Sequence, residues 1–268
     1  MNRTPKLVAL VMALFVLAAA GEAPTNAVLV DHRALYRMSL ARTTAGSDIQ
    51  GLSGEMLLEV KSTCEGSTVT QMLKTDTWGD DQVVQRGALT ASSFESRDGK
   101  SFRFAMHNDI DGSAVADFEG TATRTDPSAA GTIAFEKDAF PPVALPPGAF
   151  FPGAYMEQLL AAAEARERVI AVTVFDGAEQ GRIFRSTSII GPRSDEPVST
   201  IEALAGVAHW PVVLSYFPLG SNDDTPEYES SFDLYWNGVS GRLLLDYGDF
   251  AMKGELTSLQ ILPMPQCN

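Results

Sequence analysis

Residues 227–238 read EYESSFDLYWNG, and this stretch decides the fold class. Four large apolar residues lie an even number of positions apart: Tyr228, Phe232, Leu234 and Trp236. Polar residues occupy alternate positions on the opposite face: Glu229, Ser231 and Asp233. Because successive side chains of a strand point to opposite faces, the pattern predicts a half-buried β-strand. The Asn237-Gly238 pair that follows tolerates positive φ angles and predicts a tight hairpin.

The same alternation recurs along the chain. In residues 34–40, ALYRMSL, the face-sharing residues are Tyr36, Met38 and Leu40; in residues 101–107, SFRFAMH, they are Phe102, Phe104 and Met106. Asp-Gly pairs at 98–99, 111–112 and 176–177 again favour hairpins. We therefore expect about twelve to fourteen strands, joined mostly by hairpins, in a mainly antiparallel architecture.

The middle of the chain departs from this pattern. Residues 141–153, PPVALPPGAFFPG, are too rich in proline to be expected to form a strand ladder. They lead into residues 154–168, AYMEQLLAAAEARER, where helical spacing connects Met156, Leu159, Leu160 and Ala163. One amphipathic helix is therefore predicted near the middle, and the proline-rich linker suggests β-rich halves at 28–140 and 154–268. A shorter helix is predicted from Ser199 to Gly206, with Glu202 completing a capping box.

The N-terminus has the form of a secretory signal peptide. Arg3 and Lys6 precede an apolar run without charges, and Ala18 and Ala20 form an A-x-A cleavage pattern. The run is shorter than the roughly 20 residues of a spanning helix, so a stable membrane anchor is disfavoured. We expect residues 1–20 to be removed, leaving a soluble periplasmic protein in which residues 21–268 form a single domain.

Composition limits the partners. The chain has 20 basic and 34 acidic residues; losing Arg3 and Lys6 with the signal peptide would change the net charge from −14 to −16. Nucleic acids are therefore excluded as expected partners, because binding a phosphate backbone requires a concentrated basic surface. Attachment to an anionic membrane surface is disfavoured for the same reason.

The chain holds two cysteines, Cys64 and Cys267. In an oxidising compartment two remote thiols are expected to pair, and only one intramolecular disulfide can be formed from them. Such a bond would fasten the C-terminus to the early part of the fold. The alternative, a redox-active pair, is disfavoured because catalytic cysteines generally lie close together as C-x-x-C.

Catalytic and metal-binding motifs are represented only by near misses. Gly51–Gly54 and Gly238–Gly241 resemble the G-x-S-x-G nucleophile elbow, but the second glycine comes one residue early. Residues 107–118 resemble a calcium loop, but lack the acidic residue at the twelfth position, so a hairpin is predicted there. His32, His107 and His209 show no ligand spacing. The expectation is no catalytic residue, no metal and no cofactor.

The order of several short segments resembles the EipB family, periplasmic proteins of Gram-negative bacteria linked to cell-envelope integrity. The segments, in order, are His32–Tyr36, GLSG at 51–54, Cys64-Glu65-Gly66, FRF at 102–104, Leu145–Gly148, Phe151-Pro152, VFDG at 174–177, Ile190–Pro192, Trp210–Val212, Tyr216-Phe217, residues 225–250, Leu262-Pro263 and Cys267. Together they span essentially the whole mature chain.

The resemblance implies a single antiparallel β-spiral of about fourteen strands, built from two incomplete barrels. It implies that the two family cysteines, here Cys64 and Cys267, are bonded. It also implies a distant likeness to LolA-type lipoprotein carriers, whose curved sheets enclose an apolar cavity. No catalytic residues come with the resemblance.

Three functions follow as hypotheses. The first is a non-enzymatic factor that maintains the envelope by binding envelope components or partner proteins, which exposed apolar strand surface would favour. The second is a carrier for a lipid or other apolar ligand, which requires an apolar cavity inside the curved sheet. The third is an exported hydrolase, which a perturbed carboxylate or histidine in a cleft would favour. The expected partner is accordingly a periplasmic envelope protein or an apolar ligand, with a homodimer as a further alternative.

Overall fold

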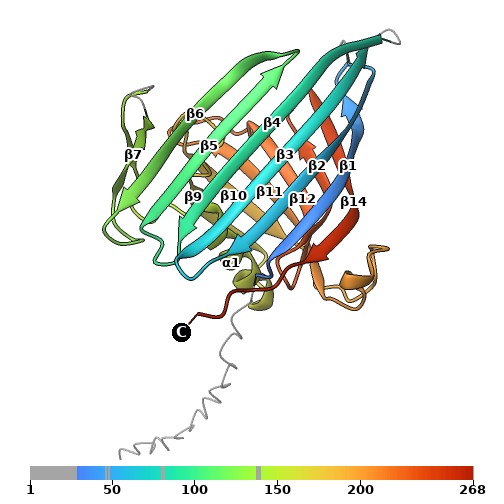
Figure 1. The fold of residues 1–268 in the computed structure, drawn as a ribbon. Coiled ribbons are helices and arrows are strands. Elements are labelled where there is room, and N and C mark those ends of the chain that lie inside the picture. The colour runs from blue at the N-terminus through green and yellow to red at the C-terminus, as the bar shows by residue number, and fades with distance from the viewer. Residues whose placement is uncertain (1–28, 46, 48, 80–81, 137–139, 268) are drawn as a thin grey trace, which may run out of the picture.

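The computed structural model describes residues 29–45, 47, 49–79, 82–136 and 140–267 (Figure 1). The predicted signal peptide, residues 1–20, lies outside the described residues. Over the part that is described, the chain forms one large antiparallel sheet with one α-helix.

The strands of the sheet follow one another in chain order. They are β1 (His32–Thr43), β2 (Gly51–Ser62), β3 (Gly66–Gly79), β4 (Gln82–Ser96), β5 (Ser101–Ile110), β6 (Ser113–Arg124), β7 (Gly131–Phe135), β8 (Val143–Leu145), β9 (Val169–Val174), β10 (Phe184–Ile190), β11 (His209–Pro218), β12 (Tyr228–Tyr235), β13 (Ser240–Asp246) and β14 (Phe250–Ile261). The helix α1 (Pro152–Glu164) lies between β8 and β9, and a single 3₁₀ turn, η2 (Glu202–Leu204), lies between β10 and β11.

The order of strands across the sheet is β8-β7-β6-β5-β4-β3-β2-β1-β14-β13-β12-β11-β10-β9. Each strand pairs with its neighbours in sequence, except that β8 and β9 do not pair; in addition, the first and last strands, β1 and β14, pair with each other. The sheet curves so that β1 to β6 form one wall and β9 to β12 another behind it, with α1 near the lower end (Figure 1). The sheet is not closed by a strand ladder between β8 and β9. The predicted mainly-β spiral is therefore confirmed.

Alternation along the strands matches the prediction in β1 and β5. Tyr36 and Met38 are buried, as are Phe102, Phe104 and Met106. Strand β12 differs. Phe232 and Leu234 are buried as predicted, but so is Asp233, which was expected on the polar face. Arg242 of β13 neutralises the Asp233 carboxylate, with Nη2 2.7 Å from Oδ1. A paired carboxylate can be buried at this position because its charge and hydrogen bonds are satisfied.

The predicted Asp-Gly turns are only partly tight hairpins. Asp111 and Gly112 both have positive φ angles and join β5 to β6 in a two-residue turn, so the hairpin predicted in place of a calcium loop is confirmed. Gly99 likewise turns with positive φ between β4 and β5. Asp176 and Gly177, however, begin a longer connection, residues 175–183, that leaves the sheet. The tight hairpin predicted there is wrong.

The proline-rich linker does contribute a strand, contrary to expectation. Val143–Leu145 forms β8 and pairs with β7, while the prolines lie on either side of it. Farther along, Phe150 bridges in parallel to Val174 of β9, with its N–H 2.8 Å from the carbonyl oxygen of Thr173. The linker thus lies against the second edge of the sheet.

Helix α1 is confirmed, although it begins earlier than predicted and ends at Glu164. Proline is well suited to its first position, because the first N–H of a helix has no intrahelical acceptor. Glu95 of β4 accepts the next two N–H groups, those of Gly153 at 2.7 Å and Ala154 at 3.2 Å. The carboxylate of a distant strand therefore fixes the start of the helix. The second predicted helix, from Ser199 to Gly206, is reduced to the 3₁₀ turn η2.

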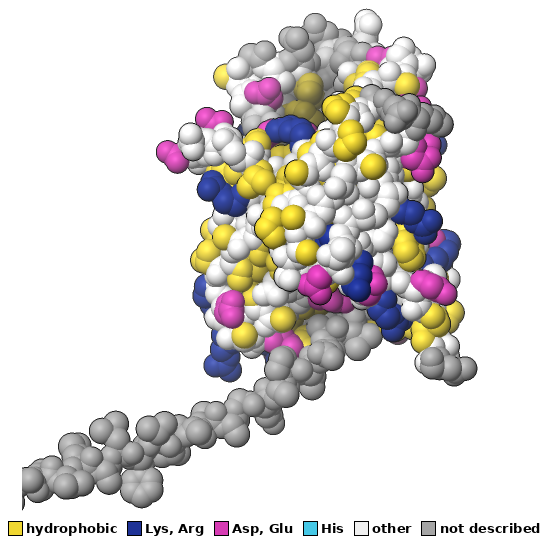
Figure 2. Space-filling model, turned by 90° about the vertical axis from the view of Figure 1, so that its left-hand side faces the viewer, with side chains coloured by type: hydrophobic (Ala, Val, Ile, Leu, Met, Phe, Trp, Pro, Cys, Tyr) yellow, Lys and Arg dark blue, Asp and Glu magenta, His cyan; other side chains and the backbone are white. Residues whose placement is uncertain are grey.

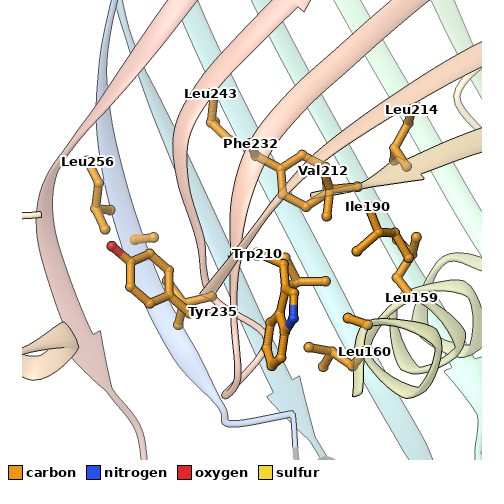
Figure 3. Packing of buried hydrophobic residues seen from close by; sticks show 14 of the residues in the cluster. Leu159, Leu160, Ile190, Trp210, Val212, Leu214, Phe232, Tyr235, Leu243 and Leu256 are labelled. Carbon is orange, nitrogen blue, oxygen red and sulfur yellow. The ribbon is translucent and has the colours of Figure 1, made fainter. Parts of the chain in front are cut away.

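Two hydrophobic cores fill the inner side of the curved sheet. The first joins α1 to the strands of the back wall, where Leu159 and Leu160 face Ile190 and Trp210 (Figure 3). The second is rich in phenylalanine and is formed mainly by residues of β5 to β8 and of the segments around α1 and β9. Its phenylalanine rings contact one another in a continuous network: Phe102, Phe104, Phe118, Phe135, Phe140, Phe151 and Phe175. Phe104 is therefore a packed core residue, 4% exposed.

A disulfide joins Cys64 to Cys267 across 203 residues of sequence, as expected from the sequence. Two hydrogen bonds of Asp31 connect the segments that flank this disulfide. Asp31 accepts the N–H of Ser62 at 2.8 Å, and its carbonyl oxygen accepts the N–H of Leu262 at 2.8 Å. The segment after β14 is thus attached both to the start of β1 and to the turn between β2 and β3.

Removal of the disulfide should lower stability without changing the fold. We expect Cys64→Ser to lose about 2–4 kcal/mol of the free energy of unfolding, because the open chain gains entropy when unfolded. The melting temperature, measured by circular dichroism, should fall by several degrees. Cys267→Ser should lose the same amount, and the double variant should lose no more than either one. Quantitative alkylation of both thiols in unreduced wild-type protein would contradict the assignment.

Candidate functional site

The inner face of the back wall carries a buried polar network. The hydroxyl of Tyr155, on α1, lies 2.8 Å from Ser186 Oγ and 2.6 Å from Ser188 Oγ of β10. Both serines are fully buried. Burial raises the pKa of Tyr155, so its phenol stays protonated and can donate a hydrogen bond. The network joins the helix to the sheet through polar atoms inside an otherwise apolar region.

A second polar group lies beside this network at the start of the 175–183 connection. Tyr216 and Tyr228, on β11 and β12, stack with their ring centroids 4.4 Å apart. The hydroxyl of Tyr228 lies 3.5 Å from Asp176 Oδ2, and the other carboxylate oxygen accepts the N–H of Ala178 at 2.9 Å. Burial raises the pKa of the Asp176 carboxyl, with a smaller contribution from the nearby charge of Glu179.

The 175–183 connection belongs to the second half of the chain, but it packs against strand β5 of the first half. Its Gly177 lies so close to Phe104 that an added Cβ would approach the Phe104 Cβ to 2.6 Å. Glycine is therefore required there, both by space and by the positive φ of 71°. Arg182 anchors the far end of the connection through Glu179 at 2.5 Å and Glu227 at 2.6 Å. The connection is thus fixed to both walls.

The three histidines lie on β1, β5 and β11, which are not neighbours in the sheet. His32 and His209 are buried in β1 and β11, and each keeps one ring nitrogen without a hydrogen-bond partner among the described residues. Burial lowers the pKa of His32, which favours its neutral form. His107 is exposed on β5, with Nδ1 3.5 Å from Asp117. Among the described residues, no group of three or more His, Cys, Asp or Glu side chains could hold a metal ion.

Two open grooves on the outer face of the sheet are lined by a mixture of polar and apolar atoms of the described residues. One, of about 420 Å³, lies over β4 to β6, and its lining includes Thr90, His107, Asp117 and Glu136. The other, of about 620 Å³, lies over β2 to β5 and the turn that follows β5, and its lining includes Lys74, Asp76, Arg86 and Asp109. Neither groove has the mainly apolar lining of a typical small-molecule site.

Large apolar side chains also remain exposed on the outer face. Val169 and Ile189 are 60% and 54% exposed, and they are direct cross-strand partners on β9 and β10. Half-buried Val213 of β11 continues the row. Within the part of the chain that is described, no helix is long and apolar enough to cross a membrane.

Sequence reasoning brought Cys64 and Cys267 together but missed the inner polar network. The only sequence signal for it lies in residues 184–190, FRSTSII, where Ser186 and Ser188 occupy the face that Phe184 and Ile190 also share. Two serines on the apolar side of a strand need hydrogen-bond partners when buried. The sequence did not show that Tyr155 of α1 would supply them.

An open, curved antiparallel sheet that wraps around two packed cores defines a barrel-like β-protein. The chain belongs to the EipB-like family, whose model matches residues 23–263. It is 32% identical to the cell envelope integrity protein EipB of Brucella abortus, over 91% of this chain and 88% of that protein. The fold also matches the crystal structure of a β-barrel-like protein of a domain of unknown function from Brucella abortus. That match has a TM-score of 0.81 and 32% identity, and covers 88% of this chain and all of the other.

The position of Asp176 predicts a pH-dependent stability effect. Folding raises the pKa of its carboxyl, so ionisation destabilises the folded state. This effect is absent below the pKa of an unfolded aspartate, about 3.9, and complete above the raised pKa of the folded state. Asp176→Asn keeps the shape of the side chain and should melt at a higher temperature than wild type at pH 7, but at the same temperature near pH 3.

The control for this experiment is Asp224→Asn, which removes one charge from an exposed loop. Both variants change the net charge equally, so a difference between them isolates the environment of Asp176. Equal melting shifts for the two variants at pH 7 would contradict the prediction.

Proposed function

We propose that this protein is a non-enzymatic periplasmic protein that maintains the integrity of the cell envelope by binding envelope components or partner proteins. The family supports the envelope role, because the relative from Brucella abortus is named for cell-envelope integrity. The N-terminal signal-peptide pattern supports export to the periplasm.

One structural observation carries the binding part of the proposal. The inner side of the sheet is occupied by two packed cores, while large apolar side chains such as Val169 and Ile189 stay exposed on the outer side. Exposed apolar residues that neighbour one another on a folded protein are typical of contact surfaces. The polar groups with raised pKa values, Tyr155 and Asp176, are explained by burial and internal hydrogen bonds. They do not need a substrate to account for them.

A second candidate, carriage of an apolar ligand, is favoured by a different observation. Leu73 and Leu89 are cross-strand partners on β3 and β4 and share the inner side with Met56, yet both remain half-buried. A lipid chain would find apolar contacts there. Mass spectrometry of lipids that co-purify with the protein from native periplasm tests this candidate, and a stoichiometric lipid would favour it over partner binding.

Deletion of the gene tests the proposed function. We expect the deletion strain to be more sensitive to detergents and to antibiotics that attack the cell wall, with little change under cytoplasmic stress. A plasmid copy carrying His107→Ala should restore resistance fully, because His107 is exposed and is assigned no catalytic role. Loss of resistance with His107→Ala at normal protein abundance would favour a hydrolase instead.

A further inference from the structure

The Cys64–Cys267 disulfide lies at the surface of the molecule. Cys64 belongs to the turn between β2 and β3, and Cys267 belongs to the segment that follows β14; both residues are exposed. In Figure 1 this C-terminal segment leaves the sheet at its lower end. Exposed disulfides are more accessible to thiols than buried structural ones and are exchanged more readily.

The surroundings of the two sulfur atoms differ. Nη2 of Arg97, the residue directly after β4, lies 3.7 Å from Cys267 Sγ. The same guanidinium nitrogen donates to the carbonyl oxygen of Thr63 at 3.1 Å, and the N–H of Arg97 donates to the carbonyl oxygen of Glu65 at 2.7 Å. Among the described residues, Cys64 Sγ accepts no such hydrogen bond. Arg97 is therefore held at the turn that carries Cys64, with its positive charge beside Cys267.

This difference decides which sulfur leaves when a thiol attacks the disulfide. In thiol–disulfide exchange a thiolate bonds to one sulfur, and the other sulfur departs with the electron pair of the broken S–S bond. A guanidinium is always positively charged in proteins and stabilises such a developing negative charge. Departure of Cys267 is therefore favoured, and the attacking thiol becomes bonded to Cys64.

The effect of Arg97 is local. The chain has a net charge of −14, which disfavours the approach of anionic thiols to both sulfurs. On the face shown in Figure 2, basic and acidic side chains are interspersed and form no region of a single sign. Salt screens exposed charges beyond about 8 Å at physiological ionic strength, whereas Arg97 lies 3.7 Å from Cys267 Sγ. The contact with Arg97, and not the overall charge, therefore distinguishes the two sulfurs.

We propose that Cys64 is a modification site, at which a thiol of low molecular mass forms a reversible mixed disulfide while Cys267 is released as a free thiol. The thiolate RS⁻ bonds to Cys64 Sγ, the Cys64–Cys267 bond breaks, and Cys267 takes up the proton that the attacking thiol lost. A second thiol can then attack the sulfur of the bound RS group, which leaves Cys64 as a thiol and forms RSSR. Two thiols thus supply the two electrons that reduce the disulfide. This chemistry does not depend on the proposed binding function.

The fold tolerates this exchange. Once Cys267 is released, the C-terminal segment stays attached through the N–H of Leu262, which donates to the carbonyl oxygen of Asp31 at 2.8 Å. Strand β14 also keeps its ladder with β1. Only residues 263–267 lose their covalent attachment to the turn between β2 and β3. The reaction is therefore reversible in the folded protein, because Cys267 stays close enough to displace the bound thiol.

The direct test identifies which cysteine becomes modified. The full mature protein is incubated briefly with reduced glutathione, acidified to stop exchange, and digested for mass spectrometry without reduction. We expect glutathione on the Cys64 peptide about threefold more often than on the Cys267 peptide. Neutral β-mercaptoethanol should give the same preference, because the preference depends on the leaving sulfur and not on the charge of the attacking thiol. Equal labelling of both cysteines would overturn the proposal, as would labelling mainly of Cys267 or no labelling of the folded protein.

Variants of Arg97 test the role of its charge. Arg97→Gln should make labelling of the two cysteines equal and slow the reaction with glutathione about twofold, because the favoured route loses its advantage. Arg97→Lys keeps a positive charge and should retain part of the preference for Cys64. The matched control is Arg37→Gln, which removes one charge from an exposed ion pair on β1 and should behave like wild type.

The direction of the rate change separates the charge of Arg97 from a structural role. If Arg97 only held the turn between β2 and β3, Arg97→Gln would loosen this turn and speed up the exchange, and the preference for Cys64 would stay. Faster exchange in Arg97→Gln, or an unchanged preference in a variant that circular dichroism shows to be folded, would therefore refute the role assigned to the guanidinium.

Discussion

The ladder between β1 and β14 is the interaction on which the rest of the sheet depends. It runs from His32 paired with Ile261 to Thr43 paired with Phe250, and it joins the first strand of the chain to the last. Every other ladder connects strands that are neighbours in sequence. Because contacts between distant segments carry the largest loop-closure entropy, this ladder is the most demanding part of the fold. The Cys64–Cys267 disulfide lies beside it and reduces that entropy.

The pairing of β1 with β14 determines which strands form the edges of the sheet. With β1 and β14 paired in the interior, the edges fall to β8 and β9, which come from the middle of the chain. The linker covers part of one edge through Phe150, and α1 is fixed by Glu95 of β4. The cores on the inner side and the exposed residues on the outer side both follow from this arrangement. Binding at the outer surface is consistent with it.

The sequence predicted those features that depend on local patterns. Alternation identified the buried faces of β1 and β5, and the predicted export of the chain made a Cys64–Cys267 pair the expected disulfide. Prediction from the sequence failed where a residue or strand is stabilised by a partner from a remote segment of the chain. Asp233 was predicted on the polar face because the sequence does not show that Arg242 lies beside it. Strand β8 forms between prolines because β7 provides the backbone hydrogen bonds of a ladder.

Native-state hydrogen exchange tests most directly the claim that pairing of the chain ends holds the two halves together. If the claim is correct, amides of β1 and β14 exchange only in the global unfolding event that also exposes the Phe102 amide of β5. The three should then show the same free energy of opening and the same dependence on denaturant. Exchange of β14 through a separate opening of lower free energy, with β1 and β5 still protected, would contradict the account.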